Sequence, residues 1–141
     1  MDAELEDAYA AYVLPCPPLN GSDARLHFWA WWFCGLNNAF RKDFDRHGSV
    51  GLGGNISRSL CSMQAGEPVS ATFLSQGADA GNGSLMRLAP VPLAYRTSAA
   101  AAARVAAASS LTTHPGPIAA EACAFLATLL DPKGPFTARE T

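Results

Sequence analysis

The chain has 141 residues, of which 49% are apolar, so it is long enough to bury a core and too apolar to be disordered throughout. Its net charge is −2 and its basic residues are scattered, which argues against nucleic acid or an anionic membrane as the partner. The N-terminus is acidic, unlike a secretory signal. The most apolar stretch, residues 28–36, is shorter than the about 20 residues that cross a bilayer. We therefore expect an intracellular protein, with the cytoplasm as its default location.

The four cysteines are widely spaced and form no CxxC pair, so they indicate neither a zinc site nor a redox motif. Their neighbours are apolar or small, and we interpret all four as buried thiols in a reducing compartment. They are Cys16, Cys34, Cys61 and Cys123.

The first half of the chain predicts two helical segments, a loop and a short helix. Residues 2–13 repeat apolar side chains at spacings of three and four, which predicts an amphipathic helix that prolines from Pro15 onward end. Residues 23–42 are dense in aromatic side chains, so we expect a partly helical segment whose tryptophans fill a core. Residues 43–54 are polar and rich in glycine and predict a loop. A short helix is then expected from Asn55 to about Ala65.

The second half begins with another glycine-rich loop, over residues 77–84. Residues 85–95 predict a buried helical segment that Pro90 and Pro92 kink or delay. Residues 98–110 are dominated by alanine, which favours a helix that a neighbouring helix can approach closely.

The clearest helix is predicted over residues 117–131, with Gly116 as N-cap and Pro117 as its first residue. Its larger apolar side chains recur on one side, which is typical of a packed helix. Those residues are Ile118, Ala122, Phe125, Leu126 and Leu129. No segment alternates polar and apolar residues with a period of two, so the predicted fold class is all-α, with glycine loops joining helices on one face.

The first motif that could carry chemistry runs from Asp79 to Arg87, with the sequence DAGNGSLMR. Glycines let a backbone approach a ligand closely, and successive N–H groups at the start of a helix can hold a phosphate. The side chains of Asn82 and Ser84 suit sugar hydroxyls, and the Asp79 carboxylate could act as a base or hold a ribose. The alternative is an ordinary turn between helices, in which Asn-Gly is common.

Two other segments also lie at helix entrances. The string TTHP, residues 112–115, places a histidine where it could donate to a phosphate or orient a substrate. The alternative is that Thr113 or His114 only caps the next helix. Residues 51–59 form another glycine loop before a helix, but they lack the lysine of a P-loop and follow no strand. A phosphate-loop assignment there has little support.

Together these motifs resemble the ADP-ribosylglycohydrolase family. The string AGNGSLMRLAPVPLAYR, residues 80–96, is similar to that family's GNGxxMR segment with its following alanine and proline. After an alanine-rich helix, TTHPGPIAAEAC, residues 112–123, is similar to its threonine–histidine segment. The loop at Gly54-Asn55 fits the short helix that precedes GNG in these proteins. The resemblance extends roughly from Tyr9 to Leu130.

The resemblance implies an all-α fold, an orthogonal helical bundle, and hydrolysis of an N- or O-glycosidic bond to ADP-ribose with Mg²⁺ or Mn²⁺ ions. It also implies that the GNG loop and the histidine contact ADP-ribose. Transferred to this chain, the substrate-binding residues are Gly81, Asn82, Gly83, Ser84, Met86 and His114. Asp79 corresponds to an acidic position near the scissile ribose and is the candidate catalytic residue, whereas Arg87 is expected to brace the loop.

The chain departs from the family's pattern at the metal-binding motifs. Members carry a paired-aspartate motif near the N-terminus and an aspartate–threonine–aspartate motif near the C-terminus, and neither string occurs here. We therefore predict a partial domain over residues 1–141, the central portion of the fold, that binds metal poorly and hydrolyses slowly or not at all. Uncovered apolar faces, at residues 28–33 or 125–130, are expected to cause aggregation or dimerisation.

Three functions remain open from the sequence. The first is a glycosidase that hydrolyses the bond between ADP-ribose and a protein side chain or small acceptor. The second is a non-catalytic remnant that binds ADP-ribose or an ADP-ribosylated partner. The third is a helical interaction module in which the glycine loops are only turns.

Overall fold

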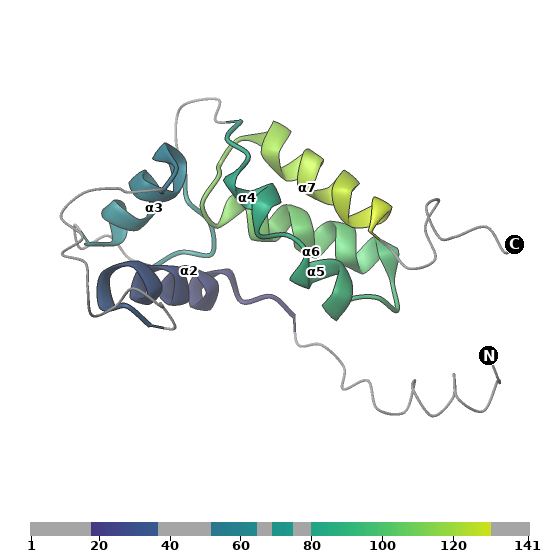
Figure 1. Ribbon diagram of the computed structural model, residues 1–141, viewed down its shortest axis with the longest axis horizontal. Coiled ribbons are helices and arrows are strands. Elements are labelled where there is room, and N and C mark those ends of the chain that lie inside the picture. Colours follow the sequence, from purple (N-terminus) through teal and green to yellow (C-terminus); the bar gives the residue numbers. More distant parts are fainter. Residues whose placement is uncertain (1–17, 37–51, 65–68, 75–79, 131–141) are drawn as a thin grey trace, which may run out of the picture.

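The computed structural model describes residues 18–36, 52–64, 69–74 and 80–130, and this part of the chain is helical without strands, which confirms the all-α prediction. The predicted helix over residues 2–13 and most of the loop over 43–54 lie outside the described residues. The described elements are α2 (Gly21–Trp29), the π-helix η1 (Ala30–Cys34), α3 (Gly54–Gln64), α4 (Gly83–Met86), α5 (Pro90–Ala94), α6 (Ala99–Leu111) and α7 (Pro117–Leu129). In Figure 1, α2 and α3 lie at one end, and α6 and α7 run side by side at the other. No helix among the described residues is long and apolar enough to cross a membrane.

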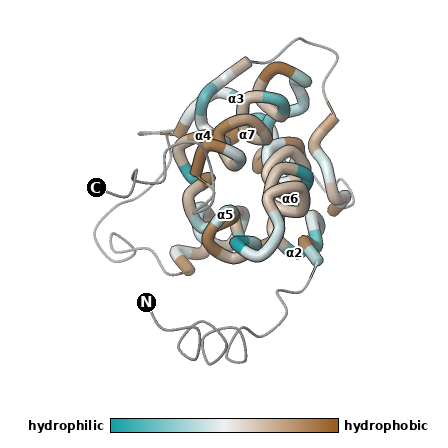
Figure 2. The backbone as a smooth tube through the Cα atoms, turned by 90° about the vertical axis from the view of Figure 1, so that its right-hand side faces the viewer, coloured by the Kyte–Doolittle hydropathy of each residue, from teal (hydrophilic) through white to brown (hydrophobic). Residues whose placement is uncertain are grey.

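Helices α6 and α7 make the most extensive helix–helix contact of the described residues. The side chains at its centre are mostly small, which lets the two backbones approach closely, as the alanine-rich composition predicts. The buried cluster consists of Leu88, Ala102, Ala106, Cys123 and Ala127. In Figure 2, much of both tubes has the brownish colours of apolar residues. Helix α7 begins as predicted, with Gly116 as N-cap and Pro117 in its first turn.

The larger apolar residues of α7 do not all face this cluster. Ile118 is 63% exposed and Phe125 is 65% exposed, whereas Ala119, Cys123 and Ala127 are buried. The close approach to α6 favours small side chains, so Ile118 and Phe125 lie on the outer side of α7, whereas Leu126 packs against the cluster. The sequence therefore predicted the helix correctly, but Ile118 and Phe125 of the predicted apolar set do not lie on its packed side.

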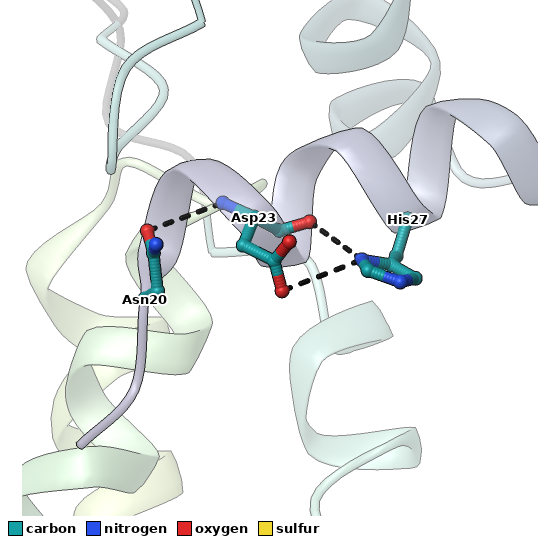
Figure 3. A network of polar contacts seen from close by, with 3 residues as sticks. All are labelled: Asn20, Asp23 and His27. Carbon is teal, nitrogen blue, oxygen red and sulfur yellow. Dashed lines mark hydrogen bonds and ion pairs between the residues drawn. The ribbon is translucent and has the colours of Figure 1, made fainter. Parts of the chain in front are cut away.

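Helix α2 begins with a side-chain cap, shown in Figure 3. The Asp23 N–H donates to Asn20 Oδ1 at 3.2 Å, which satisfies one of the free donors of the first turn. One turn later, His27 Nδ1 lies 2.9 Å from the Asp23 carbonyl oxygen and 3.5 Å from its carboxylate. The last turn widens into η1, which ends at Gly35 with a φ of 70° that suits glycine.

Prolines divide the segment that was predicted to be one kinked or late-starting helix into two short helices. Helix α4 ends at Met86, and Pro90 lies in the first turn of α5, where its missing N–H costs nothing. Leu88 between the two helices is buried, but Met86 is 80% exposed and Leu93 is 63% exposed. The segment is therefore less buried than predicted.

The prediction that every cysteine is buried is wrong for Cys34 and Cys61, which are exposed. A helix turns by about 100° per residue, so the fully buried Leu60 places the next side chain, that of Cys61, toward the outside. Among the tryptophans, Trp32 is buried and Trp31 is exposed, so the aromatic segment fills the core only in part.

Candidate functional site

The C-terminal end of α6 is held by donors from distant parts of the chain. The last carbonyls of a helix have no partner within it and need donors from elsewhere. Three of them receive hydrogen bonds here: Ser109 O from Arg87 Nη2 at 2.9 Å, Leu111 O from the Phe73 N–H at 2.9 Å, and Thr112 O from Arg25 Nη1 at 2.7 Å. These bonds fix the turn that carries His114.

Arg25 links α2 to both α3 and the end of α6. Its side chain is 2% exposed, and it donates to Ser59 Oγ at 2.8 Å and to Ser59 O at 3.2 Å. The Ser59 hydroxyl in turn donates to Thr112 O at 3.1 Å. A cation at a helix C-terminus also interacts favourably with the helix dipole. This one side chain therefore joins three helices around the turn.

Arg87 braces the same turn from the other side. Its Nη2 also donates to Thr112 Oγ1 at 3.2 Å, and its guanidinium carbon lies 4.7 Å from the centre of the Phe28 ring. Burial lowers the pKa of Arg87 to about 10, an effect that Cys123 partly opposes. The guanidinium is thus still charged at neutral pH and provides a fixed positive charge at the C-terminal end of α6.

His114 is 2% exposed and lies within a buried polar cluster. Its backbone N–H donates to Ser110 O at 2.8 Å. Its ring Nδ1 lies 2.9 Å from Thr113 Oγ1, and the tautomer determines which of these two atoms donates. The N-cap of α7 is Gly116, without a side-chain cap bond, so the alternative that Thr113 or His114 only caps this helix is wrong. The imidazole is instead held inside the molecule in a fixed orientation.

The loop from Gly81 to Gly83 packs directly on this imidazole. A Cβ added to Gly83 would lie 3.0 Å from His114 Cε1 and Nε2 and 3.1 Å from Ile56 Cδ1. A Cβ added to Gly81 would lie 2.7 Å from Asn55 Nδ2 and 3.4 Å from His114 Cδ2. A Cβ at Gly81 would therefore require Asn55 or the loop to shift, and one at Gly83 would require His114 or Ile56 to give by a few tenths of an ångström.

Ser84 anchors the loop to α6 and α7. It is 2% exposed, and its hydroxyl accepts hydrogen bonds from Ser110 Oγ at 2.8 Å and from Cys123 Sγ at 3.4 Å. The hydroxyl thus faces α6 and α7 rather than solvent. Its predicted contact with substrate stays a prediction.

The other predicted site residues lie at different depths. Asn82 is exposed between the two packed glycines, and Met86 is exposed on α4. Asp79 lies outside the described residues. The structure therefore brings the two glycines and the imidazole together, with an accessible asparagine above them.

Arg25 and Asn55 hold this site, and sequence reasoning did not select either of them for a role. An arginine inside an aromatic segment predicted to fill a core was a usable signal, since a buried guanidinium must be hydrogen-bonded. Asn55 and Ser59 are four residues apart, which places two polar side chains on one face of α3. Both are buried, with exposures of 7% and 0%.

The described residues near the loop include no cluster that could hold the Mg²⁺ or Mn²⁺ that the family resemblance implies. Among residues 18–36, 52–64, 69–74 and 80–130, no group of three or more His, Cys, Asp or Glu side chains could hold a metal ion. The described side-chain atoms nearest to Gly81 and Gly83 belong to an amide, an imidazole and an isoleucine, whereas Mg²⁺ prefers carboxylate and water oxygens. The predicted Mg²⁺ or Mn²⁺ cofactor stays a prediction.

The fold and the site define an all-α protein whose candidate ligand site is a glycine loop seated on a buried histidine. The family model described as ADP-ribosylglycohydrolase matches residues 2–132. The chain belongs to the ADP-ribosylglycohydrolase family, which confirms the resemblance seen in its motifs. Comparison with curated proteins and with solved structures found no match.

Proposed function

We propose that this chain recognises the ADP-ribosyl group of a substrate through the loop of residues 81–84, and that this recognition serves hydrolysis of a glycosidic bond to ADP-ribose. The observation that carries the proposal is the packing of Gly81 and Gly83 against Asn55 and His114. Family membership supports the ligand class. The loop geometry supports the place of binding, because a backbone without Cβ atoms can approach a ligand closely.

Each part of the loop has a distinct task in this proposal. The exposed amide of Asn82 can both donate to and accept from sugar hydroxyls or phosphate oxygens. His114 lies behind the loop, and its Cε1–Nε2 edge is the part that faces Gly83. Arg87, charged and buried, adds a positive charge behind a site for a diphosphate. Asp79 as the catalytic carboxylate and Mg²⁺ or Mn²⁺ as cofactor remain predictions.

Binding is tested by isothermal titration calorimetry with ADP-ribose. We expect the wild-type chain to bind and Asn82→Ala to bind about tenfold more weakly, the loss of one hydrogen bond to a charged or polar group. The melting temperature should not change, because Asn82 is exposed. Asn20→Ser is the matched control, since it also replaces an exposed asparagine and retains the α2 cap. Equal affinity of wild type and Asn82→Ala would indicate that the loop is an ordinary turn between helices.

Hydrolysis is tested separately, by release of ADP-ribose from an ADP-ribosylated peptide with and without Mg²⁺. Turnover by the wild type that Asp79→Asn abolishes, with binding retained, would support the glycosidase. Binding that is independent of metal, without turnover, would instead support a non-catalytic ADP-ribose-binding protein. Absence of binding would favour a helical interaction module.

A further inference from the structure

Asn55, in the first turn of α3, has a side-chain orientation that its neighbour determines. Its Oδ1 accepts a hydrogen bond from Arg58 Nη2 at 2.7 Å. A guanidinium can only donate, so the amide oxygen must face Arg58 and the amide nitrogen must face the other way. The positions of the oxygen and nitrogen of this side chain therefore follow from chemistry.

The Asn55 amide nitrogen points at the loop. It lies 2.7 Å from the position that a Cβ of Gly81 would occupy, and the residue as a whole is 7% exposed. Within the described part of the chain, this nitrogen has no hydrogen-bond acceptor. This nitrogen is not among the fully buried side-chain nitrogens that lack a partner, so it keeps some contact with solvent. A donor without a protein acceptor beside the loop is available to a ligand oxygen.

We propose that Asn55 is a further ligand-contacting residue of the site, and that its Nδ2 donates to an anionic oxygen of the diphosphate bound at Gly81. This proposal rests on the proposed function. Among the described residues, the atoms nearest to a Cβ at Gly81 or Gly83 belong to an amide, an isoleucine and an imidazole. Arg58 adds a positive charge directly behind the amide. Such surroundings favour a phosphate oxygen, which only accepts hydrogen bonds.

The sharpest test is Asn55→Asp. A carboxylate keeps the acceptor that Arg58 requires, removes the donor and adds a negative charge beside the Arg58 guanidinium, so the fold should be retained. The matched control is Asn20→Asp, which adds the same charge at an exposed position and preserves the α2 cap. Affinities of the full chain for ADP-ribose, ADP and adenosine are measured by calorimetry, with melting temperatures recorded for each variant.

We expect Asn55→Asp to weaken binding of ADP-ribose and ADP by about thirtyfold or more, and to leave adenosine, which has no phosphate, unchanged. Asn55→Leu, which removes the donor without adding charge, should weaken the two diphosphates by about fivefold. A donor to a ribose hydroxyl predicts a different result, because a hydroxyl could donate to the new carboxylate and affinity would be retained. Unchanged affinity for ADP-ribose and ADP in either variant would overturn the assignment.

A measurement on the unmodified chain does not depend on how the variants fold. The side-chain amide resonances of Asn55 should shift on titration with ADP and stay in place on titration with adenosine. Resonances that ADP does not move, in a chain that binds ADP-ribose, would overturn the role of Asn55 alone. A wild-type chain that binds neither ADP-ribose nor ADP would overturn the proposed function and this inference together.

Discussion

The middle and the C-terminal end of α6 are stabilised by different interactions. Along its length, α6 packs on α7 through small apolar side chains such as Ala106 and Cys123, both with no exposed surface. At its C-terminus, it is surrounded by hydrogen bonds from Arg25, Ser59 and Arg87. The apolar contact stabilises the fold without specifying a chemistry. The polar end fixes a backbone turn and an imidazole, and it is the part that positions a site.

This comparison predicts that the polar end is the more sensitive to loss of a side chain. Arg25→Met removes the donors to Thr112 O and to both oxygens of Ser59, inside a region with almost no solvent. We expect the free energy of unfolding to fall by about 3 kcal/mol, the cost of leaving buried acceptors unsatisfied. Urea denaturation followed by circular dichroism measures it. Arg104→Met, at an exposed position of α6, is the control and should change the value by less than about 0.5 kcal/mol. Similar effects of both variants would show that the C-terminal end of α6 is not especially sensitive to loss of a side chain.

The apolar middle of α6 should instead be sensitive to added volume. Ala106 has no exposed surface and lies where α6 approaches α7. Ala106→Leu should lower the free energy of unfolding by about 2 kcal/mol, since the gap between the helices cannot accept the larger side chain without backbone shifts. Ala108→Leu, on the exposed side of the same helix, is the matched control and should be nearly neutral. Thermal unfolding of the pair would show a loss confined to the first variant, and equal melting temperatures would contradict the close packing.

The sequence predicted well what depends on local pattern and poorly what depends on distant partners. The starts of α3 and α7 were predictable because caps, prolines and spacing act within a few residues. The side of α7 that is buried was not, because it depends on how closely α6 approaches. Arg25 was missed for the same reason, since its acceptor at Thr112 is 87 residues away. Of the site, the loop and the histidine could be predicted as a pair through the family resemblance. The depth of His114 could not, because it depends on packing against the loop of Gly81 and Gly83, which is distant in the sequence.

A substitution in the loop of residues 81–84 should affect binding more than stability. Gly81→Ala introduces a Cβ 2.7 Å from Asn55 Nδ2, so either the amide or the loop must move. We expect a loss of about 1 kcal/mol in the free energy of unfolding and a clear loss of ADP-ribose affinity. Gly53→Ala is the matched control, because a Cβ there meets nothing within 4 Å. Calorimetry and thermal unfolding of the two variants distinguish the effects. Full affinity in Gly81→Ala would show that ligand does not contact this part of the loop.

The smallest effect on stability is expected on the outer side of α7. Ile118 and Phe125 are seven residues apart, 63% and 65% exposed, and so lie on one uncovered side of the helix. An exposed apolar face of this kind promotes association between copies of a chain. Phe125→Ser should therefore change the free energy of unfolding by less than about 0.5 kcal/mol, yet reduce concentration-dependent self-association in sedimentation velocity. Ala127→Ser, on the buried side of the same helix, should do the reverse, because a buried hydroxyl costs stability while the outer surface is unchanged. A wild-type chain that stays monomeric at high concentration would show that the apolar outer side of α7 is tolerated in water.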